Sequence, residues 1–267
     1  MGRGWAKGRT AATDPRIARA AAGHRGKTYA RRTPRERCRW PVAGSTTLPL
    51  RWSNEMAYVV GLTATDGCLV SGRRAINFKS GDRQLVETYL ALLGRTNRIK
   101  LQRTRTGGNA YFTQFHDSAL YEWFRSVGLT PRKSLTLGAI SVPDEFLPAL
   151  VRGLLDGDGS VINKTYRADT GRRDDYYWEY LITSFNSGSR AHLDWLSGRL
   201  FNLLGLKSAV SELTTTRPRR HPYFGLRFGK RASLVLLPLL YSTGAPCLER
   251  KRAVWYAYAA KHGLSVG

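Results

Sequence analysis

The sequence is poor in acidic residues, and this shortage is its most informative absence. Only 19 aspartates and glutamates stand against 43 lysines and arginines, which gives a net charge of +24 over 267 residues. Solubility does not require so large an excess of one sign. A polyanionic partner, above all nucleic acid, explains the excess better than an anionic membrane surface or plain solvation does.

Cysteine is also scarce. Cys38, Cys68 and Cys247 are isolated, and none lies in a CxxC pair. This odd number of scattered cysteines supports neither a disulfide framework nor a zinc site. The five histidines form neither an HExxH motif nor a closely spaced pair, which argues against a metal-histidine nuclease. We expect a reducing, intracellular setting.

Long apolar runs are missing as well. No segment approaches the length of a membrane span, and no apolar stretch follows the basic N-terminus as it would in a signal peptide. We therefore expect a protein of the cytoplasm, the nucleoid or an organelle that has no membrane partner. With 42% apolar and 11% aromatic residues, the chain can nevertheless bury a sizeable core.

A ten-residue sequence motif, which we call the word, is present twice. Its copies, YVVGLTATDG and LVRGLLDGDG, stand 92 residues apart, so that Gly61 aligns with Gly153 and Asp66 aligns with Asp158. Each copy is an apolar run with a small residue in its middle and a carboxylate followed by glycine at its end. We expect two helices that pack closely at Gly61 and Gly153 and bring both acids to one place.

Similar elements follow the two words, which predicts an internal duplication. The first half is expected to contain a helix capped by Ser53, then a strand at 73–79, a helix at 82–93, strands at 98–105 and 109–116, and a helix at 118–127. The second is expected to contain a helix starting at 143–145, a strand pair between 161 and 185, a helix at 190–204, strands at 209–215 and 223–229, and helices at 232–240 and from 247.

The fold class is therefore α+β, with two pseudo-symmetric αββαββα-type repeats. We divide the chain into a basic N-terminal extension at 1–52, a first repeat at 53–141 and a second repeat at 142–267. The extension holds 13 basic and two acidic residues, and it includes a short predicted helix that Asp14 caps and Pro15 begins. It is either an arm that lies along DNA phosphates or a disordered basic tail.

The two acids at the ends of the words predict a metal site. A carboxylate at the C-terminal end of a helix faces the negative pole of the helix dipole, which favours a bound cation. Two such acids side by side raise each other's pKa unless a cation neutralises them. Oxygen ligands of this kind suit Mg²⁺, although other divalent cations can substitute. The expected chemistry is hydrolysis of a phosphodiester.

These features resemble the LAGLIDADG homing endonucleases of the single-chain, two-motif kind. The resemblance extends from Ser53 to the C-terminus, and it includes the connector at 128–134 and the Pro-Asp-Glu at 143–145 before the second word. It implies a DNA-binding β saddle in the major groove above two paired motif helices. It also implies a monomer that cuts both strands of a long asymmetric double-stranded DNA target with Mg²⁺, in support of intron homing.

The family's site residues can be transferred to matching positions. Asp66 and Asp158 match the metal-binding catalytic acids, and the backbone carbonyls of Thr65 and Gly157 are placed to assist them. Lys133 in the connector and Lys251 near the C-terminus stand where the family has a basic residue that orders water or stabilises the phosphate. Only the first word departs from the family pattern, because it has Ala64 where the second word has Asp156.

Base contacts are expected from strand residues that face away from the core. In the first repeat these are Asn77, Lys79, Arg98, Lys100, Gln102, Gln114 and His116, whose side chains can pair with purine edges. In the second repeat the comparable residues are Arg167, Arg172, Arg173, Arg217, Arg219, Arg220, Arg227 and Lys230. Any single one of them can equally contact a phosphate or remain solvated.

Three other interpretations of the sequence compete with this one. A calcium loop starting at Asp156 fails, because Val161 and Arg167 replace the required glycine and glutamate. An RNA-binding intron maturase on the same fold remains open, since it needs the basic surface but not both acids. A catalytically inactive DNA-binding regulator would be expected to lack one or both acids and to carry a helix-turn-helix, but both acids are present and no clear helix-turn-helix is visible.

Overall fold

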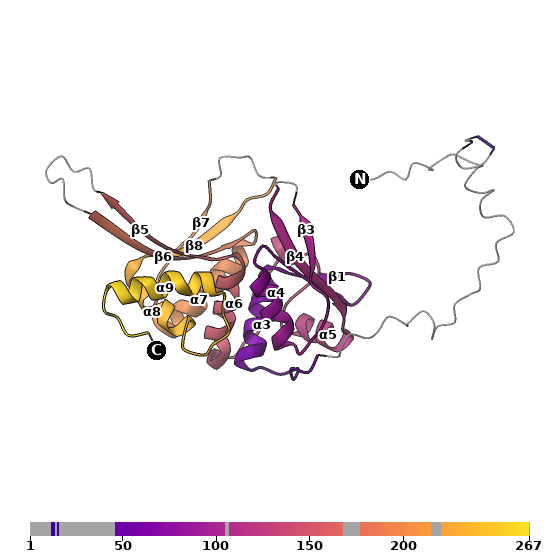
Figure 1. Cartoon of the computed structure of the whole chain (residues 1–267), viewed down its shortest axis with the longest axis horizontal. Coiled ribbons are helices and arrows are strands. Elements are labelled where there is room, and N and C mark those ends of the chain that lie inside the picture. Colours follow the sequence, from indigo (N-terminus) through magenta and orange to yellow (C-terminus); the bar gives the residue numbers. More distant parts are fainter. Residues whose placement is uncertain are drawn as a thin grey trace. The chain divides into compact units, whose positions relative to one another are not determined.

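The computed structural model describes residues 46–104, 107–167, 177–214 and 220–266, together with Ala12, Thr13 and Pro15. The described residues from 46 to 266 belong to one compact unit, which contains the helices and strands of both halves of the chain (Figure 1). Apart from Pro15, the predicted N-terminal helix lies outside the described residues. So do four of the predicted DNA-binding residues, Arg172, Arg173, Arg217 and Arg219.

The described part of the first half forms a four-stranded antiparallel sheet with three helices. The elements are α3 (Asn54–Thr65), β1 (Gly67–Val70), β2 (Ala75–Ser80), α4 (Arg83–Leu92), β3 (Lys100–Arg103), β4 (Asn109–His116) and α5 (Ser118–Ser126). The strand order is β1-β2-β4-β3. The predicted cap is confirmed, because the Ser53 hydroxyl accepts a hydrogen bond of 3.1 Å from the Met56 amide.

The second half repeats this arrangement. A short connector helix, η1 (Lys133–Leu135), leads to η2 (Asp144–Phe146), α6 (Leu147–Asp158), β5 (Ser160–Arg167), β6 (Tyr177–Ser187), α7 (Arg190–Leu204), β7 (Val210–Glu212), β8 (Phe224–Phe228), α8 (Lys230–Leu240) and α9 (Glu249–Lys261). Its sheet is also antiparallel, with the order β5-β6-β8-β7. The predicted α+β fold of two similar repeats is confirmed.

Several predicted boundaries were wrong. The second motif helix begins at Leu147 and not at 143–145, because Pro143 caps a separate 3₁₀ turn to which Asp144 and Glu145 belong. Pro148 then lies in the first turn of the helix. Strand β1 was not predicted, since four residues directly after a helix give too short an alternation to recognise. Strand β3 starts at Lys100, so Arg98 precedes it.

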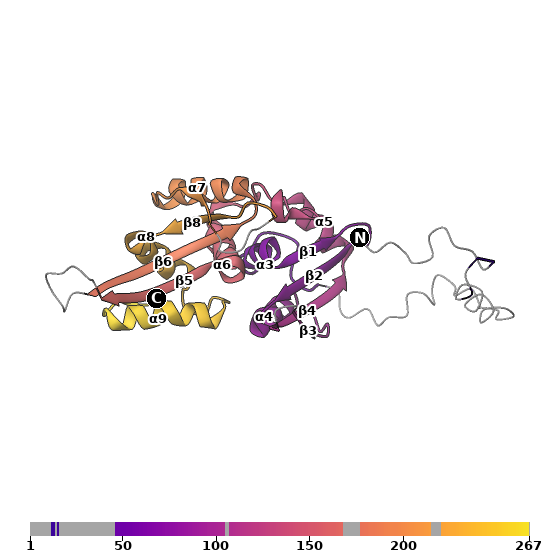
Figure 2. The same cartoon turned by 90° about the horizontal axis from the view of Figure 1, so that it is seen from above.

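Helices cover one face of each sheet, and the described elements leave the opposite face without a helix (Figures 1 and 2). In the first sheet Ile76, Phe78 and Phe115 are buried beneath the helices. Their neighbours alternate to the other face, where Asn77 pairs with Gln114 in the antiparallel register. Leu101, which pairs with Tyr111, is 58% exposed because β3 is an edge strand.

Helices α3 and α6 pack against each other between the two sheets (Figure 2). Residues 56–64 of α3 are all buried, as expected for a helix that is apolar on every side. None of the helices in the described ranges combines the length and apolar character needed to cross a membrane.

Candidate functional site

Helices α3 and α6 are in close backbone contact at their central glycines. A Cβ atom on Gly61 would lie 2.3 Å from the Leu150 carbonyl oxygen, and one on Gly153 would lie 2.4 Å from the Tyr58 carbonyl oxygen. The contact continues to the helix ends, where a Cβ on Gly157 would lie 1.9 Å from the Thr65 hydroxyl. Only glycine permits backbones to approach so closely.

This packing places Asp66 and Asp158 at adjacent helix ends. Asp66 is the C-cap of α3, and its amide donates a 2.9 Å hydrogen bond to the Leu62 carbonyl. Asp158 is the last residue of α6. Both acids therefore stand at the negative ends of their helix dipoles.

The nearby lysines do not fully offset the effect of burial on the two carboxyl groups. Burial and the Asp158 charge raise the pKa of Asp66 to about 7, although a hydrogen bond with Ser80 and the charges of Lys251 and Lys133 oppose this rise. Burial also raises the pKa of Asp158, again against Lys133 and Lys251. A cation between the acids would favour the ionised form of both.

The two lysines occupy matching positions in the two halves. Lys251, in the first turn of α9, donates from its Nζ to the Gly159 carbonyl at 2.8 Å. Lys133, in η1, donates from its Nζ to the carbonyl of Gly67. Gly67 and Gly159 are the aligned final glycines of the two words, so the duplication extends to the lysines.

The two lysines nevertheless differ in how firmly they are held. Besides Gly159, Lys251 Nζ donates to the Leu155, Asp156 and Gly157 carbonyls at 2.7, 2.8 and 3.3 Å. Lys251 thus binds the C-terminal carbonyls of α6 as a cap would. Its burial lowers its pKa to about 8, and burial also lowers the pKa of Lys133.

The contacts of Asp156 explain why Lys251 is held more firmly than Lys133. Asp156 is 1% exposed and accepts hydrogen bonds of 2.8 Å each from the Tyr58 hydroxyl, the Tyr241 hydroxyl and the Leu248 amide. Leu248 is the N-cap of α9, so Asp156 attaches the start of that helix to α6. Ala64, its counterpart in α3, has no carboxylate with which to attach an element.

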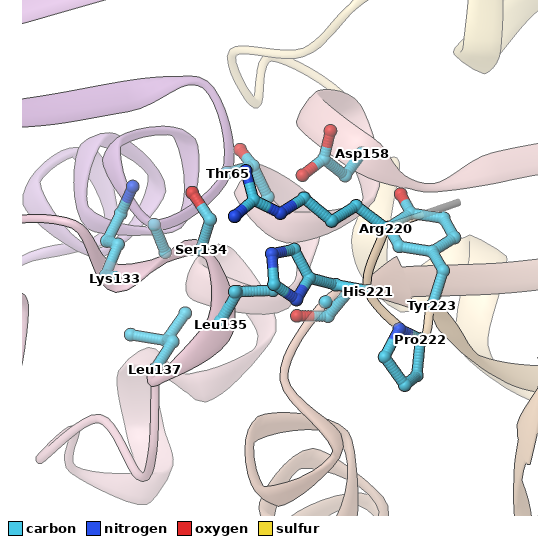
Figure 3. Close-up of a pocket in the computed structure, with 13 residues that line it drawn as sticks. Thr65, Lys133, Ser134, Leu135, Leu137, Asp158, Arg220, His221, Pro222 and Tyr223 are labelled. Atoms are coloured by element: carbon cyan, nitrogen blue, oxygen red, sulfur yellow. The ribbon is translucent and has the colours of Figure 1, made fainter. Parts of the chain in front are cut away.

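An open pocket of about 320 Å³ adjoins Asp158. Figure 3 shows the side chains of Arg220 and His221 extending into it opposite Thr65 and Ser134, with Asp158 at its rim. Arg220 belongs to the sequence-predicted basic set, whereas His221 was not predicted because nothing in its neighbourhood marks it as a site residue.

Two further polar residues at the acids were missed by sequence reasoning. The Ser80 side chain hydrogen-bonds Asp66, and the Asn186 amide donates to the Asp158 backbone carbonyl at 3.3 Å. Ser80 ends β2 and Asn186 is near the end of β6. The similarity between FKS at 78–80 and FNS at 185–187 was the available signal, because it places corresponding strand ends beside both acids.

The proposed carbonyl ligands differ in their surroundings. The Gly157 carbonyl accepts the longest of the four hydrogen bonds from Lys251, at 3.3 Å. The Thr65 hydroxyl lies 3.2 and 3.0 Å from the Gly61 and Leu62 carbonyl oxygens of its own helix, to which it can donate. Within the described ranges, no three His, Cys, Asp or Glu side chains are grouped as a metal site. Asp66 and Asp158 would therefore share an ion with backbone, water or phosphate oxygens.

Most predicted DNA-binding residues of the first repeat share the uncovered face of its sheet. Lys79 and Lys100 flank Phe112 in register, and Gln102 pairs with Ala110. Lys79 Nζ donates to the Gln102 side chain at 3.1 Å. Arg98 is exposed in the loop before β3, and His116 ends β4 with its ring 3.0 Å from the Arg73 carbonyl oxygen.

The predicted DNA-binding residues of the second repeat are less uniform. Arg227 pairs with Ser184 on the uncovered face of the second sheet. Arg167 follows Tyr166 at the end of β5, so alternation turns it to the opposite face. Lys230 begins α8, with its Nζ 5.7 Å from the Tyr258 ring centroid, and so belongs to the helical layer.

Comparison with known proteins supports the fold. No model of a protein family matches the sequence, and no curated protein matches it. A point mutant of I-SmaMI matches with a TM-score of 0.52 and 11% identity, over 79% of this chain and 92% of that one. The I-SmaMI LAGLIDADG homing endonuclease bound to cleaved DNA matches with a TM-score of 0.50 and 12% identity, over 82% and 92%.

The N-terminal LAGLIDADG domain of WhiA also matches, with a TM-score of 0.46 and 15% identity, over 78% of this chain and 90% of that one. The matches to I-SmaMI show that the chain has the fold of LAGLIDADG proteins. Identities this low establish the fold alone.

Proposed function

We propose that this chain is a site-specific DNA endonuclease that makes a double-strand break in a long asymmetric target and supports homing of a mobile intron or a similar element. The observation that carries the proposal is the pairing of Asp66 with Asp158 at adjacent helix ends, each half also supplying a lysine on the equivalent carbonyl. A pure DNA-binding protein has no need of two electrostatically strained acids in one place.

The acids fit a divalent cation. The raised pKa of Asp66 has burial as its first cause and Asp158 as its second, so a bound cation would relieve the strain that the fold creates. Asp66 and Asp158 would hold Mg²⁺, with backbone carbonyls, water and the DNA phosphate completing its ligands. When bound, the ion supplies activation of water and stabilisation of charge on the phosphate.

The protein residues around the acids have separable tasks. Asp66 and Asp158 must be ionised to act. Lys251 already donates to four carbonyls, so it offsets the negative end of α6 and favours ionisation of both acids. Within the described part of the chain, the Lys133 ammonium donates to one carbonyl, that of Gly67. This leaves Lys133 better able to turn toward a phosphate oxygen.

DNA would lie across the uncovered faces of the two sheets. The net charge of +24 favours a polyanion, and I-SmaMI is bound to DNA in the structure that matches this fold. Since one chain contains both acids, a monomer can cut both DNA strands. The two sheets differ in sequence, so they would read the two halves of an asymmetric site.

The strained acid also predicts how stability depends on pH. The folded protein binds the Asp66 proton up to a pKa of about 7, whereas the ordinary pKa of an aspartate is 3.8. Between these pH values the folded state holds more protons than the unfolded state, so stability falls as pH rises and the ionised acid is destabilising above pH 7. Asp66→Asn is therefore expected to unfold at higher denaturant concentration than the wild type at pH 8.

At pH 8 the gain is expected to be about 1–3 kcal/mol, and it should be much smaller at pH 4, where the folded state is protonated and the unfolded state is partly protonated. Urea unfolding at the two pH values without divalent cations measures it. An equal gain at both pH values would show that the Asp66 charge is not the cause.

Deleting residues 1–45 is expected to weaken DNA binding and flatten its salt dependence. The deletion stops before Thr46, whose hydroxyl donates to Asp117 at 2.7 Å, so it leaves this contact of the folded unit intact. Each phosphate contact that is lost should reduce the slope of log K against log salt by about 0.9. Binding titrations from low to high salt measure the slope. An unchanged slope would exclude the arm from the DNA interface.

A further inference from the structure

The uncovered face of the second sheet carries an apolar and aromatic pocket away from the acids. Its lining, which we call the outer patch, consists of Ile162, Lys164, Tyr166, Tyr180, Ile182 and Arg227 around a volume of about 470 Å³. Tyr166 and Tyr180 are 52% and 46% exposed, and their ring centroids are 5.7 Å apart in an edge-to-face arrangement. Nothing in the chemistry assigned to the acids uses these side chains.

The strand register connects this patch to the acids. Ile162 pairs with Ile182 and Lys164 pairs with Tyr180, and both pairs lie on the same face as the pair of Ser160 with Ser184. Ser160 comes two residues after Asp158, and its hydroxyl is 2.7 Å from that of Ser184. The patch is therefore the outward continuation of the surface that begins at the catalytic acid.

The distance along the strand sets the position of the patch on DNA. At about 3.3 Å per residue, Ile162 and Tyr166 lie roughly 7 and 20 Å beyond Ser160. With about 3.4 Å per base pair, this corresponds to roughly two to six base pairs outward from the position of Ser160.

The corresponding face of the first sheet is chemically different. It presents amide and ammonium groups around an aromatic residue, Phe112. The Asn77 amide donates to Gln114 at 3.4 Å, and Lys79 donates to Gln102 at 3.1 Å. Such groups match the donors and acceptors of purine edges. The isoleucines of the outer patch have no hydrogen-bonding groups, so they would leave those edges unsatisfied.

Thymine is the standard base that presents an apolar group, its 5-methyl, in the major groove. Lys164 and Arg227 flank the isoleucines, and their charges suit the phosphates on either side of such a base. These cations and the continuity with the acids favour DNA over an apolar protein surface. We propose that the outer part of the half-site facing the second sheet is thymine-rich, and that Ile162 and Ile182 contact thymine methyl groups. This inference rests on the proposed function.

The test removes methyl groups from the DNA and leaves the protein intact. A site is selected from a randomised duplex pool with wild-type protein, and its halves are assigned by which half loses selectivity in Gln114→Ala and which in Ile182→Ala. Thymines of the second-sheet half are then replaced by deoxyuridine, which lacks only the methyl. Affinity, measured without divalent cations, is expected to fall about fourfold per contacted methyl.

The same replacement in the first-sheet half is the matched control, and it is expected to change affinity less than about twofold. In Ile182→Ala the effect of deoxyuridine at the contacted position should shrink, as a double-mutant cycle detects. A second-sheet half-site without thymine, or one in which deoxyuridine does not change affinity, would overturn the inference without contradicting the proposed cleavage of DNA. Equal DNA affinity and selectivity of wild type and Ile182→Ala would instead assign the patch to a protein partner. Absence of any selected site would contradict the proposed function itself.

Discussion

Asp66→Asn is expected to lower the rate of double-strand DNA cleavage by at least about 10³-fold while DNA affinity stays within about threefold of the wild type. The carboxylate is the group that binds the cation, and the amide cannot replace its charge. Affinity is preserved because phosphate contacts of basic residues dominate binding. Asp158→Asn is expected to give the same result, since the two acids end equivalent helices.

The products should distinguish the two acids. If each acid serves one strand, both variants should leave nicked DNA, with different strands cut. Asp194→Asn is the matched control, because it makes the same chemical change at a partly exposed acid of α7 that forms an ion pair with Arg190 at 3.4 Å. It should cleave as the wild type does. Full double-strand cleavage by either site variant would reject the assignment of the acids.

Gly61→Ala is expected to destabilise the protein by about 2–4 kcal/mol. The new Cβ would lie 2.3 Å from the Leu150 carbonyl oxygen and 2.9 Å from Gly153 Cα, so the helices must separate. Separation would also move the acids apart, and cleavage should therefore fall in the fraction that remains folded. Urea unfolding measures the first effect.

Gly198→Ala is the control for this substitution. Gly198 also lies within a helix, α7, but a Cβ there would meet no atom of the described residues within 4 Å. Alanine in an open helical position should stabilise the fold by about 0.5–1 kcal/mol. The effects of Gly61→Ala and Gly153→Ala on the free energy of unfolding should not be additive. Once the first methyl group has moved the helices apart, there is already room for the second. Equal stability of the Gly61 and Gly198 variants would contradict the close packing of α3 and α6.

The duplicated motif predicted the two helices that meet at the site, and the similar elements that follow each copy, together with the family resemblance, predicted the fold. An apolar helix with a central glycine can be recognised from its own residues, as can an acid at its end. The positions of Lys133 and Lys251 came from the family resemblance, and the structure places both on carbonyls of the words. Their unequal attachment could not be predicted, because it depends on the contact of Asp156 with Leu248, 92 residues later.

The face of the sheet on which a side chain lies could be predicted where buried and exposed residues alternate regularly along a strand. It was harder to predict at the ends of strands and on edge strands. Asn77 and Gln114 share a face because each stands between buried neighbours. Arg167 and Lys230 carry the same charge as Arg227, but alternation and a helix start direct them elsewhere. The outer patch was missed since a basic sequence directs attention to its charges, whereas Ile162 and Ile182 look like ordinary core residues until the register is known.

Selection of cleaved molecules from a randomised DNA pool with Mg²⁺ tests the central claim most directly. Wild-type protein is expected to yield double-strand breaks at one long site with two unlike halves, and Asp66→Asn and Asp158→Asn should bind that site without breaking both strands. Selective binding by the wild type with no cleavage under the same conditions would contradict the claim, and would make the chain a DNA-binding protein that uses this fold without its chemistry.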